Sequence, residues 1–301
     1  MTMPALSLTA VPGRRRQTLE LAGEIERRGF AGLWVPSPFA GLSLCHALAH
    51  VTERLTFATS IAPIYFQPVD EFAQAAGFLH EVSGGRFRFG IGVSHQSTHR
   101  RLGLSAGRPL EDMRGFVDRL RAVPRTGSLP PVVLAAMRPR MITLAGEIAD
   151  GVVFANACRS RIAASLEALP FAVRADPKFE VACMTPTCVS EDLEAARAVN
   201  RRTLSRYARL PYYRAYWREA GYAEEMDEVE RVLDRDDAAV AARLSDRWLD
   251  DTTLAGRPGR IREGVEELVE AGVRTPILVP SSAVGNQMKA FAEVFGVYAP
   301  A

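Results

Sequence analysis

The residues best suited to acid–base chemistry in this sequence are two histidines that lie close together. His95 comes two residues after an apolar run at residues 87–93, and His99 comes four residues later. An imidazole has an unperturbed pKa near ~6.5, so it can donate or accept a proton at neutral pH. We interpret His95 as the first candidate for a general acid and His99 as a weaker one. The alternative is that His95 only hydrogen-bonds a carbonyl group of a substrate or cofactor. The remaining histidines fall on predicted helices, where packing or surface roles are expected: His46, His50 and His80.

The sequence lacks the patterns that indicate several other chemistries. No glycine-lysine phosphate loop, Gly-x-Ser-x-Gly elbow or zinc-type Cys/His spacing occurs. Gly90 and Gly92 lack the third glycine of a dinucleotide-binding fingerprint and lie inside a predicted strand. The cysteines have no metal-ligand spacing, so we predict no metal site and expect reduced thiols in a cytoplasmic protein: Cys45, Cys158, Cys183 and Cys188.

Composition limits the partners of this chain. With 48% hydrophobic and 24% charged residues, the 301-residue chain is ordinary for a globular protein with a sizeable core. A formal net charge of +2 gives no argument for binding nucleic acid or an anionic membrane surface. The N-terminal segment carries its apolar run before its arginines, which does not fit a secretory signal, and no apolar run has membrane-spanning length. We therefore expect a small-molecule substrate.

The segment at residues 52–95 predicts one strand–helix–strand unit. An apolar, β-branched run at 55–62 is followed by apolar residues at helical spacing over 69–82. A Ser-Gly-Gly-Arg turn at 83–86 stops the helix, and the run at 87–93 then has no alternating polar residues, which is typical of a parallel strand buried on both faces.

The same reading, carried along the chain, predicts eight strands separated mostly by helices. We place the strands at 5–11, 32–38, 55–62, 87–93, 130–137, 152–155, 179–189 and 276–280. We place helices at 13–29, 42–51, 69–82, from about 109, and at 139–149, with a polar loop after His95. This pattern predicts a single-domain (β/α)8 TIM barrel over residues 1–301.

One long segment departs from this alternation. Residues 191–253 contain no strand candidate, and we interpret them as a helical insertion between the seventh and eighth predicted strands. Its aromatic residues are too dense for a solvated face: Tyr207, Tyr212, Tyr213, Tyr216 and Trp217.

The barrel prediction limits where a site can lie. In such barrels the active site forms at the carboxyl ends of the strands. The residues at those ends are Ser37 and Pro38, Ser60 to Ala62, Val93 to His95, Ala136 to Arg138, Ala155 and Asn156, Thr185 and Thr187, and Ser281 and Ser282.

Two stretches of sequence resemble a known family. TERLTFATSIAP, at 52–63, and LHEVSGGRFRFGIGVSH, at 79–95, resemble the bacterial-luciferase-like (LLM class) flavin and deazaflavin oxidoreductases, whose fold is a (β/α)8 barrel. The later segments RLGL, RPLEDMR and LAAM are most similar to subfamilies described as coenzyme F420-dependent oxidoreductases. The resemblance therefore implies hydride transfer between coenzyme F420, a deazaflavin, and a small organic substrate.

The resemblance also implies which residues bind the cofactor. In this family the strand ending at Ser60 and Ile61 carries a bulge and a non-proline cis peptide on which the ring rests; the alternative is a buried trans strand end. The implied cofactor-binding residues are Ser60, Ile61, Ala62, Val93, Ser94, Ala136, Met137, Arg138 and Asn156, with His95 as the catalytic residue. In relatives that oxidise sugar phosphates a glutamate stands at the position of His95.

This sequence departs from the family at two strand ends. Met137 and Arg138 replace the small glycine turn whose amides point at the cofactor phosphate, so a basic side chain would have to compensate. The candidates for that role are Arg138, Arg140, Arg159, Arg257 and Arg260. Ser37 and Pro38 replace acidic and histidine residues of the relatives, which argues against glucose-6-phosphate dehydrogenation and a luciferase reaction.

Three further expectations follow from the resemblance. An FMN-dependent monooxygenase of the same fold is the nearest alternative, and a cofactor-free accessory or binding barrel is the second. The helical insertion is expected to cover the mouth of the barrel and help form the substrate pocket. A homodimer is expected because relatives are often dimers.

Overall fold

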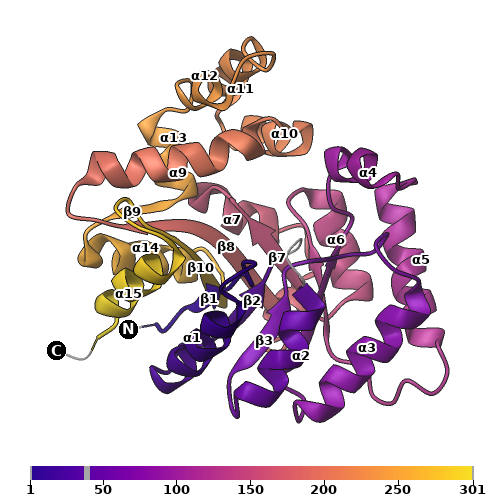
Figure 1. Cartoon of the computed structure of the whole chain (residues 1–301). Coiled ribbons are helices and arrows are strands. Elements are labelled where there is room, and N and C mark those ends of the chain that lie inside the picture. Colours follow the sequence, from indigo (N-terminus) through magenta and orange to yellow (C-terminus); the bar gives the residue numbers. More distant parts are fainter. Residues whose placement is uncertain (1, 37–40, 300–301) are drawn as a thin grey trace. The chain divides into compact units, whose positions relative to one another are not determined.

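The computed structural model describes residues 2–36 and 41–299 (Figure 1). The chain divides into two compact units. We call residues 4–154 and 166–182 the N-terminal unit, and residues 155–165 and 183–299 together with residues 2–3 the C-terminal unit. Ser37 and Pro38, which the sequence places at the end of the second strand, lie outside the described residues. The single-domain assignment stays a prediction.

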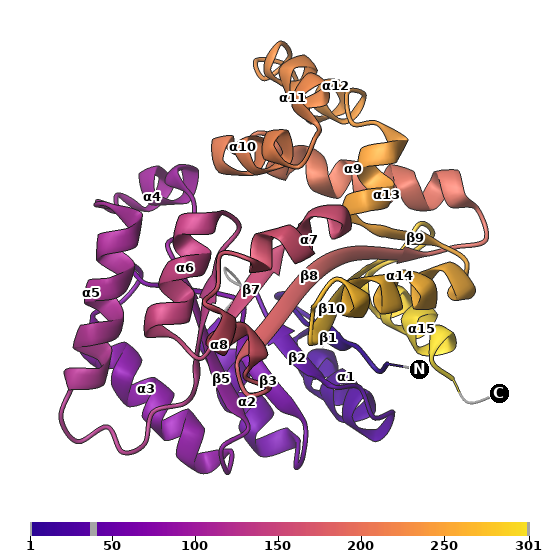
Figure 2. The same ribbon diagram turned by 180° about the vertical axis from the view of Figure 1, so that it is seen from behind.

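The N-terminal unit repeats strand and helix in alternation. Its elements are β1 (Ala5–Ser7), α1 (Arg15–Arg27), β2 (Gly32–Val35), α2 (Gly41–Val51), β3 (Thr56–Thr59), β4 (Ala62–Pro63), α3 (Val69–Val82), β5 (Phe87–Gly92), α4 (Gln96–Leu102), α5 (Pro109–Ala122), β6 (Val132–Ala135), α6 (Pro139–Ile148), β7 (Gly151–Ala155) and α8 (Phe171–Ala175). Within this unit α3 packs beside α5, and α5 beside α6 (Figure 2).

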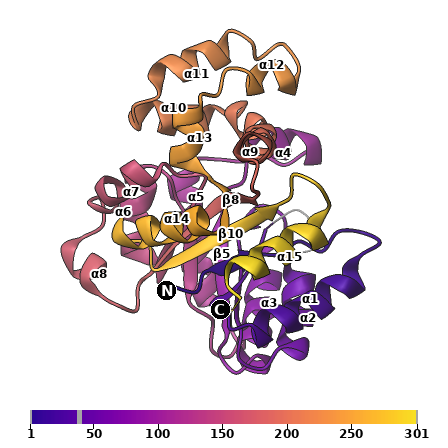
Figure 3. The ribbon, with the colours of Figure 1, turned by 90° about the vertical axis from the view of Figure 1, so that its left-hand side faces the viewer.

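The C-terminal unit is mostly helical. It contains α7 (Arg159–Leu166), α9 (Leu193–Ala208), α10 (Pro211–Glu219), α11 (Ala223–Glu230), α12 (Asp237–Ala241), α13 (Asp246–Thr252), β9 (Leu254–Gly256), α14 (Pro258–Glu270), β10 (Thr275–Ser281), α15 (Gln287–Val297) and most of β8 (Glu180–Val189). Within it α14 and α15 lie side by side along β10 (Figure 3).

The strands form a closed parallel barrel. Their order is β10-β1-β2-β3-β5-β6-β7-β8-β9, with β4 beside β5 and a further pairing of β8 with β10 that completes the ring. Parallel registers run from Leu6 opposite Leu33 to Val133 opposite Gly151. Apart from β4 and β9, eight strands remain, so the predicted (β/α)8 fold is confirmed.

Most predicted elements are confirmed, and the differences have local causes. Helix α3 and the strand at 179–189 lie within a residue of their predicted limits. The polar loop expected after His95 is wrong, because residues 96–102 form α4, which ends at Gly103 with a φ of 65°. The strand β9 was missed, since three residues are too short to show a periodicity. No strand interrupts residues 191–253, as the sequence predicts.

An aromatic cluster joins strands to helices in the N-terminal unit. Phe57 of β3 stands opposite Phe87 of β5, with ring centroids 5.6 Å apart. Phe72 of α3 lies 5.7 Å from Phe89 of β5 and 5.7 Å from Phe116 of α5. All five side chains are buried. Each such pair contributes about 0.5–1.5 kcal/mol beyond area burial, so β3, β5, α3 and α5 are held as one body.

The amino ends of β3 and β5 are fixed by two charged side chains. The Glu26 carboxylate on α1 accepts hydrogen bonds from the backbone N–H groups of Glu53, Arg54 and Leu55, at 2.7 to 3.1 Å. Burial raises the pKa of Glu26, but these backbone donors outweigh it and the pKa is lowered. The Arg86 guanidinium donates to the carbonyls of Ala49, Leu55 and Ser83 and to the Thr52 hydroxyl.

Candidate active site

Three predicted site segments lie together because of the strand order. β3, β5 and β6 are neighbours and run parallel, so their carboxyl ends fall at one edge of the sheet. Ser60 to Ala62, Val93 to His95 and Ala136 to Arg138 directly follow these strands. The N-terminal unit therefore brings together all the predicted site residues except Asn156.

The segment after β3 has the backbone features that the resemblance implies. The Ser60–Ile61 peptide bond is cis, which confirms that expectation. Ala58 pairs with Arg88 of β5, and Ala62 pairs with Ile91. The chain between Ala58 and Ala62 therefore has one residue more than the chain between Arg88 and Ile91, which is a β-bulge. The Ser60 N–H donates to the Val35 carbonyl at 2.7 Å, which fixes the kinked segment to β2.

Ile61 forms an apolar platform at this strand end. A Cβ added to Gly92 would stand 2.9 Å from Cγ1 of Ile61 and 3.1 Å from Cβ of Ala135, so the Ile61 side chain packs closely against Gly92, where no side chain would fit. Ile61 is only half-buried, whereas Ala62 and Ala136 are buried. These residues fit a flat, mostly apolar ring, because small side chains keep the strand ends level and Ile61 leaves one face accessible.

The segment after β5 carries the candidate general acid. Ser94 has a left-handed φ of 62°, and His95 is the N-cap residue of α4. His95 is half-buried; burial first, and then the charge of His99, lower its pKa. A lowered pKa makes the neutral imidazole the main form at pH 7, so His95 is ready to accept a proton and donates one only from its minor protonated form.

His99 is part of a buried polar chain behind this segment. Its Nε2 lies 2.7 Å from the Val93 carbonyl oxygen, and its ring meets the Tyr65 ring edge-on at 5.1 Å. The Tyr65 hydroxyl donates to Asp112 Oδ2 at 2.6 Å, and burial followed by this carboxylate raises the pKa of Tyr65. Sequence reasoning missed Tyr65 and Asp112, because the two residues are 47 positions apart and neither directly ends a predicted strand.

The segment after β6 carries Arg138, the cationic side chain that the resemblance implies at this edge of the sheet. Ala136 is buried and donates its N–H to the Val153 carbonyl at 3.1 Å. Met137 is half-buried, and Arg138 is exposed at the N-cap of α6, where Pro139 begins the helix. No acidic residue lies in the first turn. The N-terminal end of α6 can attract an anion through the charge of Arg138, but the glycine turn that the resemblance implies is absent.

Asn156 belongs to the C-terminal unit. It is buried with a left-handed φ of 57°, its N–H donates to Met184, and its carbonyl accepts from Trp217 Nε1 at 3.1 Å. Its Nδ2 makes no hydrogen bond of normal geometry among the described residues. Burial, followed by Tyr207, raises the pKa of Tyr213, and the nearby Asn156 side chain moderates that rise.

Trp217 and its neighbours form an aromatic core within the C-terminal unit. Trp217 and Trp248 meet edge-on with centroids 4.7 Å apart, and Tyr213 lies 5.4 Å from Trp217. The prediction that these aromatics are not solvated is confirmed for Tyr213, Tyr216 and Trp217. It is wrong for Tyr212, which is 60% exposed, because α10 turns that position outward.

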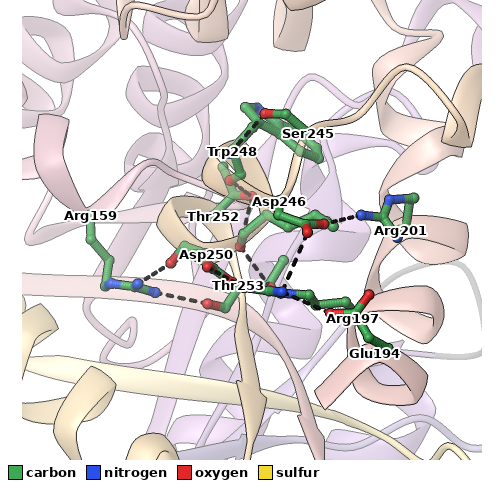
Figure 4. Close-up of polar contacts among 11 residues, drawn as sticks. Arg159, Glu194, Arg197, Arg201, Ser245, Asp246, Trp248, Asp250, Thr252 and Thr253 are labelled. Atoms are coloured by element: carbon green, nitrogen blue, oxygen red, sulfur yellow. Dashed lines mark hydrogen bonds and ion pairs between the residues drawn. The ribbon is translucent and has the colours of Figure 1, made fainter.

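The arginines proposed to compensate for the missing glycines are mostly engaged elsewhere. Arg159 donates to the backbone carbonyls of Asp250 and Thr253 (Figure 4). It also pairs with Glu267 at 2.9 Å. Arg257 pairs with Glu191, and Arg260 with Glu267. Arg159 is therefore an internal tie of the C-terminal unit.

Figure 4 shows how these ties secure α13. Arg197 of α9 binds Asp250 at 2.7 Å and Asp246 at 3.3 Å, while Arg201 of the same helix also binds Asp246. Arg159 approaches from the other side of α13. The helical insertion is thus fastened at both faces of α13, and these charges are structural.

The polar side chains on β8 and at the end of β10 are buried or half-buried. Thr185 and Thr187 are buried, and the Thr187 hydroxyl donates to the Thr185 carbonyl. The Ser282 hydroxyl donates to Glu293 at 3.1 Å. Ser281 is half-buried at the end of β10.

Thiol and metal chemistry find no support in the described residues. All four cysteines are buried and unpaired, and burial raises their pKa values, to about 11 for Cys183 and Cys188. No group of three or more His, Cys, Asp or Glu within residues 2–36 and 41–299 is placed to hold a metal ion. Over the same part of the chain, no helix is both long enough and apolar enough to cross a membrane.

Comparisons with known proteins cover nearly the whole chain. The profile of the luciferase-like monooxygenase family matches residues 2–275. The chain is 24% identical to a 5,10-methylenetetrahydromethanopterin reductase of Archaeoglobus fulgidus, over 95% of this chain and 96% of the relative.

Two solved structures share the fold. The coenzyme F420-dependent tetrahydromethanopterin reductase of Methanopyrus kandleri has a TM-score of 0.76 at 16% identity, covering 98% of each chain. The oxygenating constituent of 3,6-diketocamphane monooxygenase from Pseudomonas putida, in complex with FMN, has a TM-score of 0.64 at 17% identity, covering 99% of this chain and 96% of the other.

Proposed function

Because this chain belongs to the luciferase-like monooxygenase family, we propose that it is an oxidoreductase that transfers a hydride between a deazaflavin, coenzyme F420, and a small organic substrate. The observation that carries the proposal is the half-buried Ile61 after β3, which packs on Gly92 of the neighbouring β5, the strand that the half-buried His95 follows. The fold shared with a coenzyme F420-dependent tetrahydromethanopterin reductase supports the deazaflavin.

Each residue of the site has a proposed role. Ile61, with Ser60 and Ala62, supports the cofactor ring on one face, and Val93 and Ser94 border it. His95 would give a proton to, or take one from, the substrate heteroatom, and a bound cofactor would supply or accept the hydride at the adjacent carbon. Because the hydride carries two electrons and one proton, the substrate gains or loses two electrons and two protons in total, and the reaction is balanced.

Binding of the cofactor phosphate is assigned to the segment after β6. Arg138 would supply the charge, and Ala136 and Met137 the surface beside it. Asn156, which the resemblance also implies as a cofactor ligand, lies in the C-terminal unit, where its side chain interacts with Tyr213, and it has no role in the proposed site. Arg159 is withdrawn from this role, because its guanidinium is occupied within its own unit.

The direct test is a fluorescence titration of the purified protein with coenzyme F420 and, separately, with FMN. We expect micromolar binding of the deazaflavin and weaker binding of FMN. Arg138→Ala should weaken deazaflavin binding, while Arg119→Ala, which changes an exposed arginine on α5, serves as the matched control. Preferential binding of FMN would contradict the proposal.

The FMN-dependent monooxygenase remains the second candidate. It is supported by the fold shared with an FMN-bound monooxygenase, and the same platform would suit an isoalloxazine ring. Oxygen consumption in the presence of reduced FMN would favour it. Binding of neither cofactor would leave the cofactor-free accessory barrel, which the absent glycine turn after β6 favours.

We also propose that the protein is a cytoplasmic homodimer. Helices α2 and α3 pack together and present apolar side chains outward: Val51 is 42% exposed, Phe78 52% and Val82 38%. The Phe78 ring stacks on His46 of α2 at 5.7 Å. An apolar patch of this kind suits a second copy of the chain. Phe78→Arg should yield monomers in analytical ultracentrifugation.

A further inference from the structure

The turn at the end of β5 has a backbone conformation that its residues do not favour. Ser94 has a φ of 62°, in the left-handed region. A residue with a Cβ populates the left-handed region about tenfold or more less than the right-handed region. Something outside Ser94 must therefore hold the turn.

The side chain of His99 is placed to do this. Its Nε2 lies 2.7 Å from the Val93 carbonyl oxygen, which can only accept, so Nε2 carries the proton. His99 sits one helical turn after His95 on α4, and its own N–H donates to the His95 carbonyl at 3.0 Å. The backbone and the side chain of His99 thus hold both ends of the turn, at Val93 and at His95.

His99 is itself fixed from behind. It is 7% exposed, and the Tyr65 ring packs edge-on against its imidazole. The Tyr65 hydroxyl is anchored on Asp112 of α5. Gly107 lies against the same carboxylate, since a Cβ there would stand 2.7 Å from Asp112 Oδ2. The position of the His99 imidazole on α4 is therefore fixed by Tyr65, which follows β4, and through it by Asp112 of α5.

We infer that His99 is a positioning residue: it holds the Val93–His95 turn so that His95 faces the reacting groups, and Tyr65 and Asp112 keep His99 in place. The inference rests on the proposed function for the role of His95. A ligand at the carboxyl ends of β3, β5 and β6 then binds only protein in which the Val93–His95 turn is formed. Loss of the hydrogen bond from His99 to the Val93 carbonyl therefore lowers the fraction of binding-competent protein.

The test compares three replacements of His99. In His99→Gln the amide Nε2 reaches the Val93 carbonyl and can still donate, whereas His99→Asn is too short and His99→Leu has no donor. We expect His99→Gln to bind coenzyme F420 within about twofold of wild type, and the other two variants to bind about tenfold more weakly, as expected for a turn that is no longer held.

The second readout needs no cofactor. Histidine side-chain NMR of the free protein should show the Nε2–H tautomer for His99, and His95 resonances that His99→Gln preserves and His99→Leu shifts. Equilibrium unfolding of each variant identifies any that fail to fold. Wild-type His95 resonances and wild-type affinity in His99→Leu would overturn the inference.

Tyr65 offers an independent check. Tyr65→Leu removes the ring and should reproduce the affinity loss of His99→Leu, whereas Tyr65→Phe keeps the ring contact and should lose less. Equal effects of both replacements would contradict the ring's role. If wild type bound neither coenzyme F420 nor FMN, the proposed function would fail, and the His95 resonances would still decide whether His99 positions the turn.

Discussion

The two ends of β3 and β5 differ in how their polar groups are used. At the amino ends, Glu26 and Arg86 have their charged groups saturated by backbone partners, and Arg86 also stands over the Phe57 ring at 5.4 Å. At the carboxyl ends, Ser94 has a left-handed backbone and His95 is only half-buried. In parallel barrels the amino ends carry stability and the carboxyl ends carry chemistry. Substitutions at the two ends should therefore separate folding from function.

The largest effect is expected from His95→Ala. Removing a general acid costs 10²–10⁴-fold in turnover, while the free energy of unfolding should change by about 1 kcal/mol or less at a half-buried site. If His95 donates a proton, wild-type turnover falls as the pH rises through its lowered pKa, below the ordinary value of about 6.5.

The variant should lose that pH dependence, which steady-state kinetics at several pH values would measure. Wild-type turnover with an unchanged pH profile in His95→Ala would show that His95 only hydrogen-bonds a carbonyl or has no role. His50→Ala, which changes an exposed histidine on α2, is the matched control.

Arg86→Leu should give the opposite result. It leaves four acceptors at the amino ends without their donor, which lowers the free energy of unfolding by roughly 3 kcal/mol. Because the site lies at the other end of the strands, the deazaflavin affinity of the folded fraction should stay within about twofold of wild type. Urea unfolding and a fluorescence titration check the two parts, with the exposed Arg114→Leu on α5 as control.

Gly92→Ala tests the platform itself. The new Cβ would press on Ile61 and Ala135, and the Ile61 side chain would have to move. We expect deazaflavin affinity to fall about tenfold and stability to fall by about 1–2 kcal/mol. Gly115→Ala on α5, where a Cβ meets only the end of Arg119 at 3.6 Å, should leave affinity unchanged. Equal losses in both variants would contradict a specific platform at Ile61.

Glu26→Gln should have the smallest effect. The neutral amide keeps an acceptor but loses the charge, which costs about 1 kcal/mol at pH 7 for a partly exposed group. The folded pKa of Glu26 is lowered, so its stabilisation is present above the ordinary carboxyl pKa and is lost as the pH falls through the folded value. The difference between the two proteins should therefore shrink in acid, as thermal unfolding at several pH values would measure.

Part of the sequence that carried the family resemblance lies at the stabilising end. Arg86, the arginine of the Ser-Gly-Gly-Arg turn, ties α2 to the end of α3, and Glu53 and Arg54 offer their backbone to Glu26. These positions can be recognised because the motif residues are close in sequence, although Arg86 reaches Ala49 of α2 and the backbone at 53–54 reaches Glu26 of α1. Tyr65 and Asp112 could not be found in this way, since their bond depends on how the loop after β4 meets α5.

The sequence by itself determined the eight strands of the barrel and the placement of His95 at a strand end, because local hydrophobic periodicity and turn residues are fixed by neighbours in sequence. The bulged segment at Ser60 and Ile61 was implied by the family resemblance and not by periodicity. The tertiary structure alone decided that Arg159 is an internal tie, that Tyr212 faces outward, and that His99 returns to the Val93 carbonyl. Those outcomes depend on partners distant in sequence or on the direction a helix faces, which no local pattern records.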